Sequence, residues 1–335
     1  MEQAGLRIEG LGPALRPGQV LALLGEGADA VLLGVAGLGP ATQPAFIGPA
    51  PLAGLAAHRR GLGVVPRATG LLPGLDVAAN IAWPLRLNRT EKASRVAAAL
   101  AALGLQPLAG RAIASLSLAE ARRVALARAL ATQPAALLLQ EPFAGLAAPE
   151  AEALALLLRR LGPPVILTSG TGTAALAAAD RVAVLHQGRL LQLAPPRQAY
   201  ARPADALVAA LTGEANFLPG RVAEVFDDEC RVALAGGATV AAMLGTELPV
   251  GARCQVMLRP ESLAVAAVAP EAMGEGALAA TLRQAVFQGG QVRLDLDLAG
   301  GQVLLARRPA GLRLPAPGEA CAVGWETGQA LAFPA

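Results

Sequence analysis

The first part of the chain alternates short apolar runs with longer Ala/Leu-rich stretches, up to about residue 211. Short apolar runs predict strands, and the longer stretches predict helices. We expect strands over 20–24, 135–139, 165–168 and 181–185, and helices over 93–103, 116–131 and 150–161. Strands interleaved with helices in this way are typical of an α/β sheet covered on both faces.

The pattern changes after Asn216, where short segments of alternating polarity follow one another, punctuated by Gly and Pro. These segments predict strands over 220–225, 230–234, 254–258, 291–298 and 302–306. Many short strands with frequent turn residues indicate a small all-β barrel or sandwich. The sequence therefore predicts two domains of different class.

The length of the chain agrees with two domains, and its composition indicates where in the cell it is expected. The chain has 335 residues, enough for two domains, and 54% of them are hydrophobic. No run of eighteen or more apolar residues is free of charges or Gly/Pro breaks, so no membrane span is expected. Residues 1–4 also lack the basic start of a secretory signal. We expect a cytoplasmic chain that is soluble, or peripheral to a membrane through a partner.

Charge and cysteine content exclude further classes of function. The net charge is only +3, the arginines are dispersed and aromatic residues make up 3%, so no nucleic-acid partner is expected. Lys92 is the only lysine, which excludes any mechanism that needs a lysine elsewhere. Cys230, Cys254 and Cys321 lack CxxC spacing and are expected to be buried apolar side chains.

One strand and the helix before it resemble a known family. The strand LLLQEP at 137–142 follows a stretch reading SLAEARRVALARAL at 117–130. Together they resemble the second half of an ATP-binding cassette (ABC) ATPase. The resemblance implies a P-loop NTPase-like α/β domain over 1–211, with a helical subdomain near 75–133.

The C-terminal part resembles a second module of the same proteins. Asn216-Phe217-Leu218-Pro219-Gly220, Arg259-Pro260-Glu261 and Gly324-Trp325 look like the transport-associated OB-like (TOBE) domain. That domain ends the ATPase subunits of polyamine, ferric-iron, phosphonate and some sugar importers. The resemblance implies an OB-like β domain over 216–335, which in such proteins supports dimerisation or regulation.

The segment VLALLGEGADAVL at 20–32 has the strand–loop–helix order of a phosphate-binding loop, which includes Gly25 and Gly27. Such a loop, G-x-x-x-x-G-K-[ST], surrounds phosphate with backbone amides, neutralises it with lysine and binds magnesium through a hydroxyl. Aligned without gaps, Ala30, Val31 and Leu32 replace the second glycine, the lysine and the hydroxyl residue. A deletion across the loop is an equally good account. Both alignments remove the lysine and the hydroxyl together.

The resemblance assigns catalytic roles to Gln140 and Glu141. The family residue at Gln140 is an aspartate that holds magnesium through water, and glutamine binds a hard dication less well than a carboxylate. Glu141 stands at the position that activates the attacking water and keeps its carboxylate. Gln140 is therefore a degenerate metal position, and Glu141 is the one candidate catalytic residue.

Other family positions are altered as well. Arg67 stands where a glutamine senses the γ-phosphate and magnesium, and Ser117, Leu118 and Ala119 stand in the signature L-S-G-G-Q. Arginine can bind phosphate but cannot ligate a cation. Side chains at the two signature glycines occupy space that a γ-phosphate needs. Ser117-x-x-Glu120 is also a capping box, and this structural interpretation is favoured over phosphate recognition.

Two further loops have lost their functional side chain. Ala147 ends a loop that usually ends in aspartate. Ser169 or Gly170, depending on a gap of one residue, fills the place of a switch histidine.

The family function is to bind ATP and Mg²⁺ between two such domains and to drive solute import through membrane permeases, with a solute-binding protein as an indirect partner. The altered positions favour a degenerate subunit that docks on a permease or pairs with itself or an intact ATPase. Three alternatives remain open: an active ATPase built around Glu141, a regulatory or scaffold protein acting through its β domain, and a decayed gene product.

Overall fold

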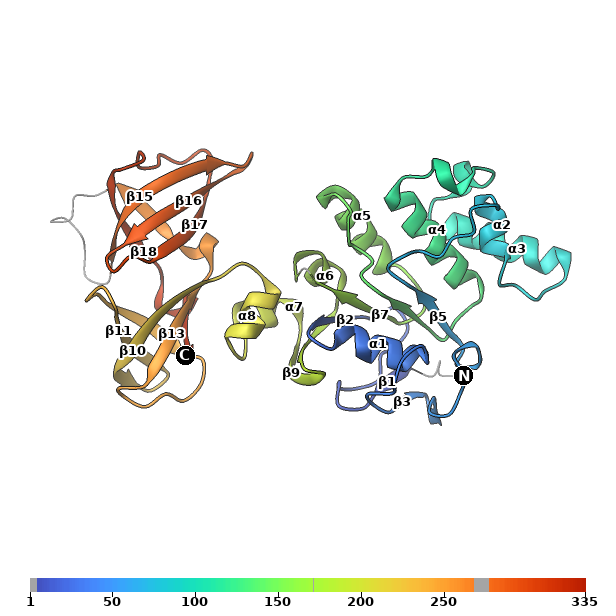
Figure 1. Cartoon of the computed structure of the whole chain (residues 1–335), viewed down its shortest axis with the longest axis horizontal. Coiled ribbons are helices and arrows are strands. Elements are labelled where there is room, and N and C mark those ends of the chain that lie inside the picture. The colour runs from blue at the N-terminus through green and yellow to red at the C-terminus, as the bar shows by residue number, and fades with distance from the viewer. Residues whose placement is uncertain (1–4, 171, 268–276) are drawn as a thin grey trace. The chain divides into compact units, whose positions relative to one another are not determined.

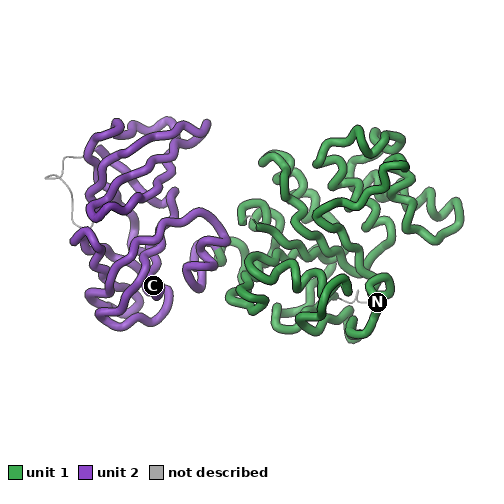
Figure 2. Tube along the Cα trace, viewed as in Figure 1, with its two compact units in different colours: residues 1–199 green, residues 200–335 purple. Residues whose placement is uncertain are grey.

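The computed structural model describes residues 5–170, 172–267 and 277–335, so the N-terminal residues 1–4 lie outside the described part. The chain divides into two compact units, residues 1–199 and 200–335 (Figure 2). Helix α8 (Ala206–Thr212) packs on β13 (Arg253–Leu258). Because of this packing, α8 belongs to the second unit, and the structure divides the chain earlier than residue 211.

The first unit is built on a six-stranded sheet in the order β5-β6-β7-β2-β8-β9 (Figure 1). All neighbours are parallel except β8 and β9, which pair antiparallel. Its inner strands are apolar and buried along almost their whole length, as expected for parallel strands covered on both faces. The strands are β2 (Val20–Gly25), β5 (Leu62–Val65), β6 (Ala136–Leu139), β7 (Val165–Ser169), β8 (Arg181–His186) and β9 (Arg189–Ala194).

Helix α1 (Ala28–Ala36) contributes to the core between the large sheet and a small one. The small sheet has the order β1-β3-β4, with strands β1 (Leu6–Ile8), β3 (Ala45–Ile47) and β4 (Ala50–Pro51). Residues of α1 share a single hydrophobic cluster with Leu23 of β2 and Leu6 of β1. This enclosure explains why the helix is apolar on nearly every side.

Three of the remaining helices of the first unit form a group beside β5, the edge strand of the sheet. Helices α2, α3 and α4 pack against one another beside β5 (Figure 1). Their bounds are α2 (Val77–Ala82), α3 (Arg89–Ala102) and α4 (Leu118–Ala131), followed by α5 (Ala148–Leu158), α6 (Gly172–Ala178) and α7 (Pro196–Ala201). The helices predicted over 93–103, 116–131 and 150–161 correspond to α3, α4 and α5.

The second unit is all-β apart from α8 and short turns. Its barrel closes in the order β10-β11-β12-β19-β13, and a five-stranded sheet follows the order β14-β18-β15-β16-β17. The C-terminal strand β19 closes the barrel between β12 and β13. The other strands are β10 (Asn216–Phe226), β11 (Glu229–Leu234), β12 (Thr239–Leu244), β14 (Ala264–Ala267), β15 (Leu278–Phe287), β16 (Gln291–Leu298), β17 (Val303–Pro309), β18 (Ala320–Gly324) and β19 (Ala330–Pro334). The predicted fold class, α/β followed by all-β, is confirmed.

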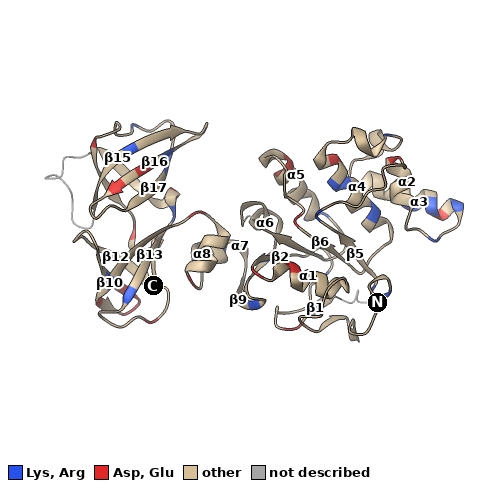
Figure 3. Cartoon of the chain, viewed as in Figure 1, with Lys and Arg blue, Asp and Glu red and all other residues tan. Residues whose placement is uncertain are grey.

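Surface charge and cysteine burial agree with the sequence. Charged residues of both signs lie scattered over the two units (Figure 3). Among the described residues, no helix is long and apolar enough to cross a membrane. Cys230, Cys254 and Cys321 are all buried, and burial together with the nearby Cys254 raises the pKa of Cys230 to about 11. These thiols are therefore inert core side chains.

Candidate functional site

The candidate site lies where three neighbouring parallel strands end. Strands β6, β7 and β2 are adjacent in the sheet, so their carboxyl ends meet at one edge. The turn after β2 leads into α1, Gln140 and Glu141 follow β6, and Ser169 ends β7. Ligands of open α/β sheets bind at this edge. The fold therefore brings the predicted loop, metal and catalytic positions together.

The loop between β2 and α1 is short. Only Glu26 and Gly27 separate the strand from the helix. Gly27 has φ +92°, and a Cβ there would lie 2.5 Å from the backbone nitrogen of Gly188, in the turn between β8 and β9. The Gly188 amide also donates to the Glu26 carbonyl at 3.1 Å. This early helix start supports the deletion over the ungapped alignment.

The early helix start changes the role of the positions named in the ungapped alignment. Val31 and Leu32 are 0% exposed and belong to the apolar core beneath the sheet. Ala30 is exposed in the first turn of α1. Val31 and Leu32 therefore cannot contact a ligand, and assigning them to the lysine and hydroxyl positions is corrected here. Asp29, in the first turn of the helix, faces the site instead.

The Asp29 carboxylate is held by two side chains from the neighbouring strand ends. The Gln140 amide Nε2 donates to Asp29 Oδ2 at 3.0 Å, and the Thr168 hydroxyl donates to Asp29 Oδ1 at 2.6 Å. Thr168 Oγ1 in turn accepts the backbone N–H of Glu141 at 3.1 Å. A continuous hydrogen-bonded chain thus joins α1, the end of β6 and the end of β7.

Gln140 is the residue type that this chain of bonds requires. Its amide oxygen faces the backbone N–H of Arg67 at 3.5 Å while its amide nitrogen donates to Asp29. An ionised aspartate at position 140 could only accept, and it would face the carboxylate of Asp29. The carboxylate that the family pattern places at position 140, after β6, is found here at Asp29 of α1.

Three carboxylates lie at this edge of the sheet. Glu26, Asp29 and Glu141 all lie there, and Lys92 is far along the chain in α3. His186 Nδ1 lies 3.5 Å from the exposed carboxylate of Glu26. Asp29 occupies the first turn of α1, where the helix dipole would otherwise favour a bound anion. A phosphate group at this helix start would therefore meet the Asp29 carboxylate in place of the family lysine.

Glu141 adopts an unusual backbone conformation. Its φ is +46°, a value that a residue with a side chain seldom adopts. A Cβ at Gly170 would lie 3.4 Å from Glu141 Oε1, so the carboxylate lies beside the residue that follows β7. Ser169 is buried at the end of that strand. Backbone strain of this kind persists where the surrounding structure fixes it, and it is common at functional sites.

The helix N-terminus at the signature position is capped by its own side chains. Ser117 Oγ accepts the Glu120 N–H at 3.2 Å, and Glu120 Oε2 accepts the Ser117 N–H at 2.7 Å. The predicted capping box is confirmed. Leu118 is exposed and Ala119 is half-buried in the first turn, where glycines would leave the backbone amides open to a phosphate.

The loops after β5 and β6 are present, but Arg67 and Ala147 in them lack the functional side chains of the family pattern. Arg67 is exposed after β5, and its side chain makes no hydrogen bond or ion pair with the described residues. Ala147 precedes α5 without a capping side chain, while Glu150 Oε2 accepts its N–H at 3.0 Å.

Comparison with known proteins identifies the family. Residues 9–144 match the ABC transporter family, and residues 256–333 match the TOBE domain. A spermidine/putrescine import ATP-binding protein PotA from Methylococcus capsulatus is 32% identical, over 96% of this chain and 86% of the relative. The chain belongs to the ABC transporter ATPases that carry a TOBE domain.

Other similar proteins agree. An Fe(3+) ions import ATP-binding protein FbpC from Pseudomonas fluorescens is 35% identical, over 76% of this chain and 72% of the relative. Among solved structures, cbiO1 from Clostridium perfringens, described as part of the ABC transporter complex cbiONQ, shares the fold with a TM-score of 0.53 and 22% identity. That likeness covers 59% of this chain and 91% of cbiO1.

The magnesium and nucleotide that ABC ATPases use do not fit the residues of this site. Both oxygens of Asp29 already accept hydrogen bonds, and Gln140 presents its amide nitrogen to them. In the described ranges, no group of three or more His, Cys, Asp and Glu side chains is arranged to hold a metal ion.

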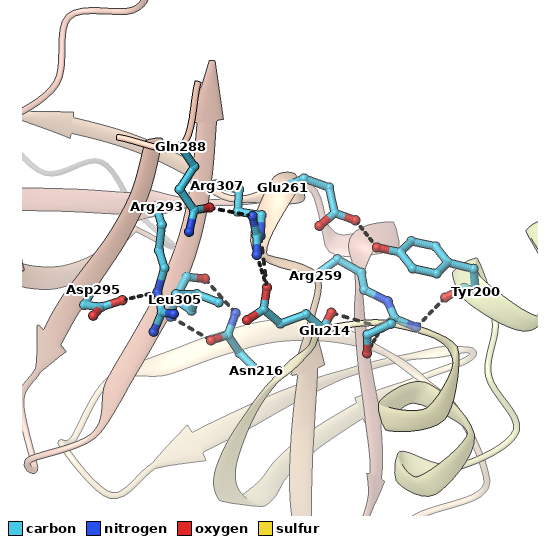
Figure 4. Close-up of polar contacts among 11 residues, drawn as sticks. Tyr200, Glu214, Asn216, Arg259, Glu261, Gln288, Arg293, Asp295, Leu305 and Arg307 are labelled. Atoms are coloured by element: carbon cyan, nitrogen blue, oxygen red, sulfur yellow. Dashed lines mark hydrogen bonds and ion pairs between the residues drawn. The ribbon is translucent and has the colours of Figure 1, made fainter. Parts of the chain in front are cut away.

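The TOBE region of this ABC ATPase uses its Arg-Pro-Glu motif for structure. The buried Arg259 guanidinium donates to the carbonyls of Ala209 and Gly213 at 3.0 Å, which closes the end of α8. It also donates to the Tyr200 carbonyl at 2.9 Å (Figure 4). The Cζ atom of Arg259 lies 4.0 Å from the centre of the Tyr200 ring, and the Tyr200 hydroxyl donates to Glu261. These contacts join α8 to the barrel, a non-local arrangement that the motif alone did not reveal.

Proposed function

We propose that this chain is a degenerate ATP-binding-type subunit of an ABC importer, one that contributes little or no ATP hydrolysis of its own. Family membership and the names of its relatives support the importer role. The loss of the lysine and the capped signature helix support the degenerate site.

The Asp29 carboxylate, bonded to both Gln140 and Thr168, is the single observation that carries this proposal. It places a negative charge at the helix start where a phosphate would bind. A unit charge pair at about 4 Å is worth on the order of 4 kcal/mol at an effective dielectric constant near 20. Replacing an attraction of that size by a repulsion weakens nucleotide binding by at least about a thousandfold.

The imported solute and the partners follow from the relatives by analogy. The relatives are named for spermidine/putrescine and for Fe(3+), so we propose a small cationic solute of the polyamine or ferric-iron type. The partners would be integral-membrane permeases, and a second ATPase subunit, either another copy or an intact homologue. The chain would then lie peripherally on the inner face of the membrane, and a solute-binding protein would take part indirectly.

Turnover by the purified chain, alone and mixed with an intact ABC ATPase, tests this proposal. We expect no Mg²⁺-dependent ATP hydrolysis by the chain alone. A rate above that of the intact enzyme, seen only in the mixture, would support pairing. Hydrolysis by the chain alone that disappears in Glu141→Gln would overturn the proposal.

One observation favours an active site built around Glu141 as a second candidate. Glu141 keeps its carboxylate and its strained backbone beside Gly170. The same turnover assay separates the two candidates, because only this second candidate predicts hydrolysis by the isolated chain.

A further inference from the structure

The loop between β5 and α2, which begins at Arg67, is held by side chains of the neighbouring helices. Two arginines of α4 donate to three carbonyls of the segment Arg67–Gly70. Arg122 Nη1 lies 2.5 Å from the Arg67 oxygen, and Arg128 lies 2.8 Å from the Thr69 oxygen and 2.6 Å from the Gly70 oxygen. We call these two side chains the arginine clamp.

The far end of the same loop is fixed by Asn80 of α2. Its amide nitrogen donates to the carbonyls of Leu72 and Leu75 at 3.1 and 3.2 Å, and its oxygen accepts the Leu72 N–H at 2.8 Å. Asn80 is completely buried. The loop therefore has anchors on both sides, all supplied by the helices of its own unit.

Arg122 also reaches the loop on the other side of the candidate site. Its Nη2 donates to the Ala144 carbonyl at 3.2 Å, in the turn that follows Glu141. One guanidinium thus ties the loop after β5 to the turn after β6. Arg122 is 6% exposed, and its Nε has no hydrogen-bond partner among the described residues. Burial, together with the nearby Arg67, lowers its pKa.

We propose that the arginine clamp fixes the segment Arg67–Gly70 to α4, so that the helix and not a nucleotide sets the position of this loop. The inference rests on the proposed function, because a loop that binds no nucleotide needs another anchor. A shift of α4 would then be carried directly into the loop and, through Arg122, into the turn at Ala144. Arg122 and Arg128 are positioning residues in this account.

Cleavage of the native chain by trypsin after Arg67 measures the release of the loop, because this exposed bond contributes its carbonyl to the clamp. In Arg122→Gln combined with Arg128→Gln, we expect cleavage after Arg67 to be faster by about tenfold or more, since each lost bond had a charged donor. Arg123→Gln is the matched control, because this neighbouring side chain has no bonding partner within the described ranges. It should cleave at the original rate.

Cleavage after Arg95, within α3, separates local release from general unfolding. The clamp predicts a rise after Arg67 alone, and equal rises at both bonds would overturn it. Arg128→Gln alone, at a half-buried position, provides a variant that keeps the buried Arg122. It should give an intermediate rate, and a rate equal to that of Arg123→Gln would count against the clamp.

The same assay with and without Mg²⁺-ATP distinguishes the two proposals. If both hold, nucleotide leaves cleavage of the original chain unchanged and the clamp variants are cleaved faster. Protection of Arg67 by Mg²⁺-ATP would overturn the proposed function. Unchanged cleavage in the clamp variants, with no effect of nucleotide, would overturn the clamp alone.

Discussion

At the residue scale, the site departs from the family pattern at several residues that contact one another, and not at one side chain alone. Asp29 supplies an acceptor on the helix, and Gln140 and Thr168 supply donors from the strand ends. These side chains satisfy one another's hydrogen-bonding groups at the carboxyl edge of the sheet. Restoring one family residue by itself should therefore harm the chain.

Gln140→Asp tests this linkage. The new carboxylate would face that of Asp29, and two like charges at about 4 Å repel by on the order of 1–4 kcal/mol, depending on local screening. We expect a loss of that size in the free energy of urea unfolding, and its recovery when Asp29→Ser is added. A Gln140→Asp chain as stable as the original would show that the Asp29–Gln140 bond does not form.

Tyr200 offers a spectroscopic test in the second unit. It is the only tyrosine, and burial together with its hydrogen bond to Glu261 raises its pKa to about 12. Because the folded pKa lies above the ordinary value near 10, the contact stabilises the fold below pH 10 and this contribution is lost as pH rises toward 12.

Absorbance of tyrosinate near 295 nm against pH reports this one side chain. We expect a midpoint well above the ordinary value near 10, and a lower midpoint in Glu261→Gln. A midpoint at the ordinary value in the folded chain would mean that the phenol is not held as described.

At the element scale, the N-caps of α4 and α5 show which of the altered family motifs still stabilises the start of its helix. Helix α4 keeps a complete capping box from Ser117 and Glu120, whereas α5 begins at Ala147 with only the return contact from Glu150. Ala147 has the φ of −66° and ψ of 155° that suit an N-cap, but it has no side-chain acceptor. The first turn of α5 is therefore less stable than that of α4.

Ala147→Ser should complete the box on α5. A serine N-cap in place of alanine adds about 0.5–2 kcal/mol to the free energy of unfolding. Ala153→Ser, an exposed position inside the same helix, is the matched control and should slightly destabilise the chain. Equal effects of the two changes in urea titrations would contradict the capping argument.

At the scale of the whole molecule, the order of elements could be predicted from the sequence because it depends on local patterns. Apolar runs and Ala/Leu-rich stretches place the sheet and its helices, and the Ser-x-x-Glu spacing places the cap at Ser117. The start of α1 could not be predicted in this way. Its apolar sequence permits several starts, and Gly27 decides the start through its contact with the distant Gly188.

The site itself depends on contacts that local patterns do not contain. Asp29 and Thr168 are separated by 139 positions, and only the sheet order β6-β7-β2 brings them together. Thr168 adjoins Ser169 in the sequence, yet no pattern distinguishes it as the partner of Asp29. The family could be identified from the sequence, whereas the hydrogen bonds that join Gln140, Asp29 and Thr168 could be found only in the structure.

We propose that the site does not bind Mg²⁺-ATP, and the free energy of unfolding with and without this ligand measures that binding. At about 1 mM ligand, a dissociation constant near 1 µM would stabilise the chain by about 4 kcal/mol. We expect no change beyond about 0.5 kcal/mol, because Asp29 occupies the phosphate position. Stabilisation by about 4 kcal/mol would contradict the account.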